Sequence, residues 1–167
     1  MTDGTHSIRT PVREFLYREA RTLDRRRYRR WVDEFLAEEV TYRVPTHTTQ
    51  EKNTRSEFSS ESWHFDDDRE SLEVRIDRLE NEYAWSANPP SRIRRFVSNV
   101  LVEPDGELAT ATDYLLVVRH DRDARDPTVL SAERHSTLRA DDGGLSLARR
   151  RVLLDQTAIG VDHLPIL

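Results

Sequence analysis

The stretch that decides the class of fold is NPPSRIRRFVSNVLVEP, residues 88–104. After two prolines, apolar and polar side chains alternate, which is typical of a β-strand, and this period continues to near the end of the chain. An Asp-Gly pair at 105–106 and Asp-Gly-Gly at 142–144 favour hairpin turns, and the charged run 121–127 favours a longer connection. The sequence therefore predicts four long antiparallel strands, over residues 92–103, 107–120, 128–140 and 145–157.

The chain before this stretch begins with helical periodicity. Thr10 is a suitable N-cap and Pro11 suits the first helical position, so we expect a first helix from there to about Arg26. From Tyr28 to Leu36, apolar residues recur at i, i+3, i+4, i+7 and i+8. This spacing indicates a second helix that packs through one face.

A strand, a loop and a third helix are predicted next. VTYRVP, residues 40–45, is expected to form a short strand that its proline stops. Residues 46–65 show little periodicity and predict a long loop, which at this length is usually functional or mobile. Asp67 and Glu70 have the spacing of a capping box and begin a third helix that ends near Tyr83.

These elements fit a single domain of the α+β class. A chain of 167 residues is long enough for one core, and helices followed by a meander of strands define the class. We expect a cone, in which a strongly curved, mainly antiparallel sheet wraps around three N-terminal helices. The domain, residues 1–167, would comprise a polar tail (1–9), the helices and first strand (10–83), the antiparallel sheet (92–157) and a C-terminal tail (158–167).

The composition excludes several classes of protein. A net charge of −5 argues against a surface that binds nucleic acid throughout. The absence of cysteine excludes disulfides, thiolate metal sites and a cysteine nucleophile. No apolar run approaches the length of a membrane span, and the first residues lack the apolar core of a signal peptide, so we expect a cytoplasmic protein.

An enzyme that uses acid–base chemistry is one hypothesis, because a curved sheet over helices often encloses a pocket. A carboxylate beside a histidine in an apolar cavity can serve as acid and base, since burial moves both pKa values towards neutrality. The alternative is that these groups are satisfied core residues or solvated strand residues, because their spacing matches no motif. The polar candidates include Asp113 and His120, and the catalytic set of this hypothesis is Asp24, Tyr42, His64 and His135.

Signals for metal or phosphate binding are weak. No two histidines are three or four residues apart, so no helix or strand offers a local pair of imidazole ligands. A two-histidine, one-carboxylate iron site can still assemble from distant residues. The acidic run 66–68 has the ligand type for a hard cation, although acids at a helix start more often stabilise the helix dipole. The sequence has no glycine-rich phosphate loop.

The arginines are the more informative feature. Of 26 basic residues only Lys52 is lysine, which reflects either genome composition or a need for planar, bidentate donors in buried or interfacial ion pairs. Arginines occupy both strand parities, as Arg94 and Arg95 do, so both sheet faces meet something other than hydrocarbon. Solvated strand faces are one explanation, and a protein–protein interface is a second. Non-specific nucleic-acid binding is a third, which the net negative charge and the lack of interleaved exposed aromatic residues disfavour. The residues expected at a protein–protein interface are Arg92, Arg94, Arg95, Asn99, Arg134, Arg149 and Arg151.

Three stretches in this order resemble a known family. EFLYREARTLDRRRYRRWVDEFLAEEVTYRVP, FDDDRESLEVRIDRLE and AWSANPPSRIRRFVSNV are similar to the β, or small, subunit of Rieske-type aromatic-ring-hydroxylating dioxygenases. The resemblance runs from about Glu14 to Gln156. It implies a cone-shaped α+β fold similar to those of nuclear transport factor 2, scytalone dehydratase and ketosteroid isomerase.

The resemblance also implies a division of labour between subunits. In this family, β subunits join catalytic α subunits in an α3β3 assembly with a core of β chains, and the α subunit holds the Rieske [2Fe–2S] cluster and a mononuclear Fe(II). The implied function is a non-catalytic, structural β subunit of a complex that inserts both atoms of O2 into an aromatic ring to give a cis-dihydrodiol, with electrons from NAD(P)H. The chain itself would hold no cofactor, and its strand arginines would pair with carboxylates of neighbouring β or α chains.

Two other functions are compatible with the sequence. The first is a stand-alone dehydratase, isomerase or cyclase of the same fold, whose acid–base pair would converge in an open pocket. The second is a ligand-binding module, whose pocket would lack any pair of titratable groups within hydrogen-bond reach.

Overall fold

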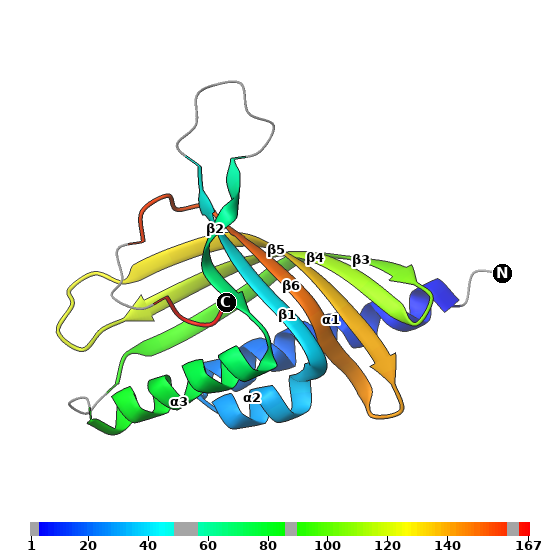
Figure 1. Ribbon diagram of the computed structural model, residues 1–167, viewed down its shortest axis with the longest axis horizontal. Coiled ribbons are helices and arrows are strands. Elements are labelled where there is room, and N and C mark those ends of the chain that lie inside the picture. Colours follow the sequence, from blue (N-terminus) through cyan, green and yellow to red (C-terminus); the bar gives the residue numbers. More distant parts are fainter. Residues whose placement is uncertain (1–3, 49–56, 86–89, 160–163) are drawn as a thin grey trace.

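The structure is a computed structural model that describes residues 4–48, 57–85, 90–159 and 164–167. In this part of the chain, helices lie on one side of a sheet that curves around them (Figure 1). The predicted α+β class is confirmed. The elements are α1 (Gly4–Asp24), α2 (Tyr28–Phe35), β1 (Leu36–His47), β2 (Phe58–Asp67), α3 (Arg69–Trp85), β3 (Arg92–Asp105), β4 (Leu108–His120), β5 (Thr128–Asp141) and β6 (Gly144–Leu154).

The sheet has the order β2-β1-β6-β5-β4-β3. Neighbouring strands are antiparallel, except that β1 and β6 run parallel. The four strands predicted in the second half of the chain are all present, and each lies within a few residues of its predicted bounds. This order places β6, β5 and β4 between β1 and β3, so those two strands meet only if the sheet curves or another segment joins them.

A bulge in β3 decides which of its side chains face the helices. Asn99 and Val100 together lie opposite the single β4 residue Asp113. Asn99 has a φ of 54°, in the left-handed region that is uncommon outside glycine. Before the bulge the buried position is Arg95, and after it the buried positions are Val100 and Val102. The bulge thus changes which alternate residues of β3 face the helices, from Arg95 before it to Val100 and Val102 after it.

A second irregularity, between β5 and β6, separates the three consecutive arginines 149–151. The register shifts between the pairs Thr137–Arg149 and Leu138–Leu147. After this shift Arg150 is buried, whereas Arg149 and Arg151 are exposed. Arginines on both strand parities therefore face different surroundings, one inside the cone and two on its outer surface.

The predicted start of the first helix is wrong. Thr10 is not an N-cap, because α1 begins at Gly4 and Pro11 lies inside it, so the predicted polar tail 1–9 is largely helical in the described residues. Proline in a helix interior removes a backbone hydrogen bond and is normally unfavourable. The extra helical turn carries Ile8, which packs against the core, and this contact accounts for the earlier start.

The predicted long loop 46–65 is also wrong for most of its described residues. β1 continues through Pro45 to His47, with register shifts on both sides of the proline, and β2 begins at Phe58. Most β2 side chains before Phe65 are exposed, so the stretch lacks the alternation by which a half-buried strand is recognised. The middle of the predicted loop, residues 49–56, and residues 86–89 around the predicted helix stop lie outside the described residues.

The third helix begins at a different cap from the one predicted. The backbone N–H of Ser71 donates to Asp68 Oδ1 at 2.9 Å, so Asp68 is the N-cap in place of Asp67. Asp67 turns inward instead, and Asp66 binds Arg43 at 2.7 Å. The three acids of the run 66–68 therefore have separate partners and do not converge on a cation.

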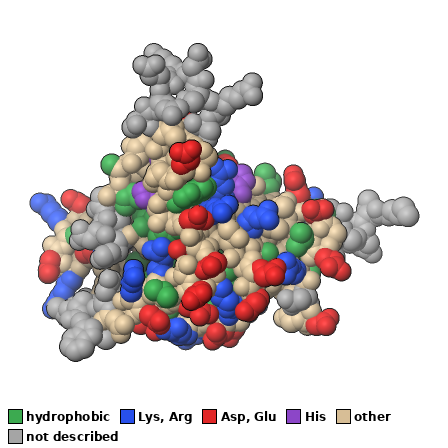
Figure 2. Space-filling view, in the orientation of Figure 1, with side chains coloured by type: hydrophobic (Ala, Val, Ile, Leu, Met, Phe, Trp, Pro, Cys, Tyr) green, Lys and Arg blue, Asp and Glu red, His purple; other side chains and the backbone are tan. Residues whose placement is uncertain are grey.

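None of the described helices is long and apolar enough to cross a membrane. Over α2 and α3, Figure 2 shows acidic and basic side chains next to each other. They include the exposed pairs Arg29–Glu80 at 3.2 Å and Arg30–Glu34 at 2.8 Å. Exposed pairs of this kind each contribute about 0–1 kcal/mol, so the stability of the fold has to come from the interior.

The conformation of Asn99 gives a first prediction. Asn99→Gly is expected to keep or raise the free energy of unfolding, whereas Asn99→Val is expected to lower it by about 1–2 kcal/mol, because a β-branched residue is strained at this φ. Urea unfolding of the purified chain measures both. Ser98→Val, next to it and also exposed, is the matched control and should change little. Equal effects of valine at both positions would contradict the bulge.

Candidate functional site

Three pairs of opposite charge lie inside the cone in the part of the chain that the structure describes. Each side chain of these pairs is at most 6% exposed. Breaking such a buried pair leaves an unpaired charge and costs about 3–5 kcal/mol, far more than any exposed pair. The pairs are Asp24–Arg95, Asp113–Arg134 and Glu19–Arg150.

The Glu19–Arg150 pair is the best satisfied of the three. Arg150 Nη1 and Nη2 donate to Glu19 Oε1 and Oε2 at 2.7 and 2.8 Å, in the fork geometry that only arginine offers. Trp31 Nε1 donates to Glu19 Oε1 at 3.0 Å, and Arg150 Nε donates to Ser136 Oγ at 3.0 Å. The pair therefore joins α1 and α2 to the sheet.

Both members of this pair stay charged. Burial raises the pKa of Glu19, but the charge and hydrogen bonds of Arg150, with Arg134 and Trp31, outweigh burial and lower this pKa below its usual 4.5. For Arg150, burial lowers the pKa and Glu19 more than reverses the effect, so the pKa is raised. Neither group can exchange a proton with a substrate near neutral pH.

The Asp113–Arg134 pair joins neighbouring strands and is less complete. The two residues lie opposite each other on β4 and β5, and Arg134 Nε donates to Asp113 Oδ1 at 2.8 Å. Nη2 lies 2.7 Å from the same oxygen without hydrogen-bond geometry, and Asp113 Oδ2 has no partner among the described residues. Burial and the charge of Arg150 lower the pKa of Arg134.

The Asp24–Arg95 pair also holds the last described residues of the chain. Arg95 Nη1 donates to Asp24 Oδ1 at 2.8 Å, while Arg95 Nε and Nη2 donate to the carbonyl of Ile166 at 3.0 and 2.6 Å. Tyr42 Oη donates to the carbonyl of Leu167 and accepts from its N–H at 3.0 Å. Ile166 and Leu167, in the predicted C-terminal tail 158–167, are buried in the core.

The predicted acid–base residues do not form a catalytic set. Asp24 and Tyr42 lie inside the cone but are bound to Arg95 and Leu167, and burial raises the pKa of Tyr42. His64 and His135 are exposed, and His135 pairs with Glu133 at 2.7 Å on the outer face of β5. The other polar candidates, Asp113 and His120, are a buried partner of Arg134 and an exposed strand end.

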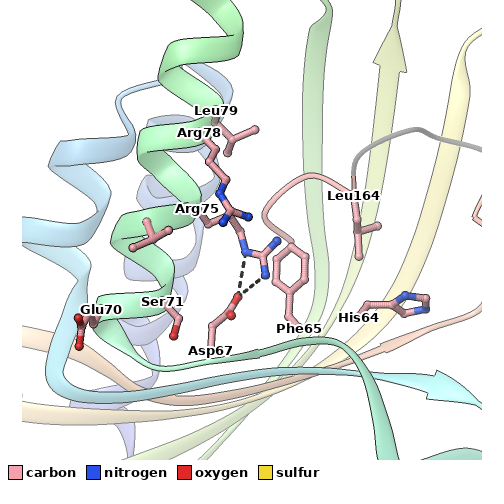
Figure 3. Close-up of a pocket in the computed structure, with 10 residues that line it drawn as sticks. His64, Phe65, Asp67, Glu70, Ser71, Arg75, Arg78, Leu79 and Leu164 are labelled. Carbon is pink, nitrogen blue, oxygen red and sulfur yellow. Dashed lines mark hydrogen bonds and ion pairs between the residues drawn. The ribbon is translucent and has the colours of Figure 1, made fainter.

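A surface pocket of about 590 Å³ lies between α3 and β2 (Figure 3). Its carboxylate Asp67 is engaged by Arg75, whose Nη2 lies 2.7 Å from Asp67 Oδ2 and whose guanidinium carbon lies 3.7 Å from the centre of the Phe65 ring. His64 also lines the pocket, but its ring points away from Asp67 in Figure 3, and burial and His47 lower its pKa. Among the described residues that line the pocket, Asp67 and His64 therefore do not form an acid–base pair.

The arginines predicted at an interface divide into two groups. Arg95 and Arg134 are 6% and 1% exposed and bind partners within the chain, so for these two the predicted contact with another subunit is wrong. Both side chains point into the cone. The bulge in β3 determines this direction for Arg95, and the alternation of side chains along β5 determines it for Arg134. The others are exposed on the sheet: Arg92, Arg94, Asn99, Arg149 and Arg151.

Large apolar side chains share the outer surface of the sheet with these exposed arginines. Phe96 and Leu116 lie directly opposite each other on β3 and β4, and Tyr114 lies two residues along on the same face. We call this group the outer patch. Its members and their exposed fractions are Phe96 53%, Leu101 70%, Tyr114 50%, Leu116 39% and Val129 45%.

Glu19 and Arg150 are the important residues that the sequence analysis missed. Glu19 falls at helical spacing between Leu16 and Leu23, on the face of α1 that is otherwise apolar. A charge on a buried helical face requires a buried partner, and this signal was available. The choice of Arg150 among the arginines 149–151 depends on the register shift in β6, which the sequence does not reveal.

Comparison with known proteins identifies the family. The chain matches the family described as "Ring hydroxylating beta subunit" over residues 18–160. The β subunit of biphenyl 2,3-dioxygenase from Rhodococcus jostii (strain RHA1) is 34% identical over 161 residues, which cover 92% of this chain and 84% of that one. The chain belongs to the ring-hydroxylating β-subunit family.

Solved structures agree in fold. Naphthalene 1,2-dioxygenase with indole bound in the active site has a TM-score of 0.80 and 21% identity, and the match covers 96% of this chain and 85% of that chain. A nuclear-transport-factor-2-like protein with a cystatin-like fold from Novosphingobium aromaticivorans has a TM-score of 0.59 and 17% identity, covering 90% and 83%. The predicted resemblance in fold is confirmed, and membership of the β-subunit family favours a dioxygenase subunit over a stand-alone dehydratase, isomerase or cyclase.

The redox groups of a Rieske dioxygenase do not fit the residues of this β subunit. A Rieske cluster takes two cysteine and two histidine ligands, and the chain has no cysteine. Within the described ranges, His, Asp and Glu side chains form no group of three with a geometry that could hold a metal ion. The cluster and the mononuclear iron belong to the α subunit in these dioxygenases, as the resemblance implied.

Acid stability tests the role of Glu19. Its folded pKa is lowered, so its contribution to stability is present above the unfolded pKa near 4.5 and is lost as the pH falls through the folded value. Glu19→Gln is expected to lower the free energy of unfolding at pH 7 by about 3–5 kcal/mol and to flatten its dependence on pH below 4.5. Urea unfolding between pH 3 and pH 7 measures both effects. A variant as stable as the parent at pH 7 would contradict the assignment.

The adjacent residues Arg94 and Arg95 allow a matched comparison between an exposed and a buried arginine. Arg95→Ala should lower the free energy of unfolding of the isolated chain by about 3–5 kcal/mol, because it leaves Asp24 buried without its partner. Arg94→Ala should change it by no more than about 0.5 kcal/mol, because Arg94 is exposed. Chemical denaturation followed by circular dichroism measures both. Similar effects at the two positions would show that the parity of β3 is wrong.

Proposed function

We propose that this chain is the non-catalytic, structural β subunit of a cytoplasmic α3β3 dioxygenase complex. The complex adds both atoms of O2 to an aromatic ring to give a cis-dihydrodiol, with electrons that originate from NAD(P)H. The α subunit supplies the Rieske cluster, the iron and the substrate pocket. The β subunit supplies a rigid cone against which the other chains assemble.

One contrast within the molecule supports this proposal. The interior of the cone, where an enzyme of this fold would need an open pocket, holds ion pairs and the buried residues Ile166 and Leu167. The outer face of the sheet carries the outer patch, whose side chains are 39–70% exposed. A contiguous exposed apolar surface on a sheet marks a protein–protein contact. The described interior is thus occupied by paired and apolar side chains, and the outer face presents an apolar surface for contact.

The bulge in β3 shapes the contact surface. Leu101 follows the bulge at Asn99 and is the most exposed member of the outer patch, at 70%. Bulges re-aim side chains at sheet edges, and β3 is one of the two edge strands of the described sheet. Leu101 therefore projects where a neighbouring subunit can enclose it, and burial of a leucine contributes about 1.5–3 kcal/mol.

The exposed arginines supply the polar part of the same surface. Arg94 lies on the outer face of β3 beside Phe96, and Arg149 and Arg151 lie on β6. None of the three forms an ion pair within the described part of the chain. A basic rim around an apolar centre is complementary to a neighbouring chain that presents carboxylates, and such charges fix orientation more than affinity.

The assembly surface is tested by a charge on the outer patch. Leu101→Asp is expected to weaken assembly at least about tenfold. In the assembled complex it would bury a charge at each contact in place of a leucine. The isolated chain should keep its circular dichroism spectrum. The measurement is light-scattering mass of the complex purified through a tag on this chain, together with iron content and visible absorption.

The matched control is Val74→Asp on α3, since Val74 is 46% exposed but lies on the opposite side of the sheet. This variant should assemble like the parent, with a larger iron-bearing chain and Rieske-type absorption. If Leu101→Asp assembles normally and Val74→Asp does not, the contact surface lies on the helices and not on the outer face of the sheet. An iron-free particle made of this chain alone, from cells that also make the α subunit, would contradict the proposed function.

A further inference from the structure

Residues 164–167 lie inside the cone, between β1 and β3. Figure 1 shows the end of this segment between the sheet and α3. Ile166 is held from β3 by Arg95, and Leu167 is held from β1 by Tyr42. These strands are far apart in the sheet order, with β6, β5 and β4 between them. The segment therefore bridges two strands that the sheet itself does not join.

The bridging contacts recognise the peptide backbone. Arg95 donates two hydrogen bonds to the carbonyl of Ile166, and the Tyr42 hydroxyl both accepts from the N–H of Leu167 and donates to its carbonyl. The segment belongs to no helix or strand. Any extended peptide offers the same carbonyl and N–H groups at this spacing, so these contacts do not depend on a covalent link to the rest of the chain.

The side chains of the segment provide selectivity. Pro165, Ile166 and Leu167 are buried, and the last two belong to the core cluster together with Tyr42. Leu164 is partly buried and forms one wall of the pocket between α3 and β2. The positions that the segment fills therefore accept apolar side chains, and a charged side chain there would be buried without a partner.

We propose that the space between Tyr42 and Arg95 is a binding site for a short, extended, apolar peptide, and that residues 164–167 are its resident ligand. An external peptide of the same kind binds when the resident segment is absent. In the intact chain the resident segment has the advantage of a high effective concentration, so an external peptide competes poorly. The site belongs to this chain and does not depend on the dioxygenase assembly.

The experiment uses a variant without residues 164–167 and the synthetic peptide acetyl-Leu-Pro-Ile-Leu-amide. Isothermal titration calorimetry should show saturable binding of a single peptide per chain, and the peptide should raise the Tm of the variant. The full chain is the matched control and should bind the peptide at least about tenfold more weakly. Equal binding by the two chains, or no binding to a folded variant, would overturn the proposal.

Two further comparisons test the chemistry of recognition. In the shortened chain, Tyr42→Phe should weaken peptide binding by about fivefold or more, because an N–H and a carbonyl lose their partner in a buried site. Acetyl-Leu-Pro-Asp-Asp-amide should not bind, since it would bury unpaired charges. Unchanged affinity of the Tyr42→Phe variant, or binding of the acidic peptide, would show adhesion elsewhere on the molecule and overturn the proposal.

If the chain without residues 164–167 does not fold, a refolding experiment still tests the proposal. The variant is then refolded from urea with and without the apolar peptide. Recovery of the circular dichroism spectrum of the full chain only when the peptide is present would support a replaceable ligand. Failure to recover at saturating peptide would show that the segment acts only through its covalent connection, and the proposal would be wrong.

Discussion

The ion pair between Glu19 and Arg150 joins the first helix to the middle of the sheet, and the rest of the interior is arranged around it. Arg150 donates two hydrogen bonds to the carboxylate of Glu19. Trp31, on the second helix, donates a further hydrogen bond to the same carboxylate. A charge at this depth is costly unless it is paired and hydrogen-bonded, and in the Glu19–Arg150 pair both carboxylate oxygens have partners. The helices therefore have one position on the sheet in which the pair is satisfied, and a shift would leave a charge unpaired.

This constraint explains why the interior of the cone is unsuited to catalysis. A general acid or base must change its protonation state near neutral pH and must reach a substrate. The carboxylates inside this cone are held by arginines, and the Tyr42 hydroxyl is bound to Leu167. A catalytic group in such a site would have to break a stabilising pair in every turnover. The same fold can thus serve as a rigid subunit when its cavity is filled and fixed.

The outer face of the sheet shows the opposite arrangement. Large apolar side chains such as Phe96 and Leu101 are exposed there, and nearby arginines lack ion-pair partners in the described residues. Arginine suits a buried pair because its planar fork can bind a carboxylate through two hydrogen bonds, and the exposed arginines of the outer face carry the same fork. The explanation by buried ion pairs is directly visible in the structure, and interfacial pairs of the exposed arginines remain a prediction.

The periodic elements could be predicted from the sequence because they follow from local rules. The four strands after residue 92 and the second helix have clear apolar repeats, and the structure contains them. The start of the first helix was wrong because a distant contact of Ile8 outweighs the local preference of Pro11 for a helix start. The strand β2 was missed because most of its side chains are exposed, so no alternation marks it.

The site was harder to predict than the fold. Adjacent arginines such as Arg94 and Arg95 point to opposite faces, and the sequence does not reveal the bulges in β3 and β6 that decide which arginine is buried. The burial of residues 164–167 depends on strands far away in the sequence, β1 and β3. Only the misplaced charge of Glu19 on an apolar helical face was a local signal of the paired interior.

The central claim is that ion pairs and apolar side chains fill the inside of the cone. The chain then contacts other subunits through the outer face of the sheet. Cryo-electron microscopy of the complex purified from cells that make both subunits tests this claim most directly. We expect Phe96, Leu101 and Tyr114 to be enclosed by a neighbouring subunit, while the three buried ion pairs and residues 164–167 keep their positions. A map in which the outer patch faces solvent, or in which a bound molecule displaces the ion pairs inside the cone, would contradict the claim.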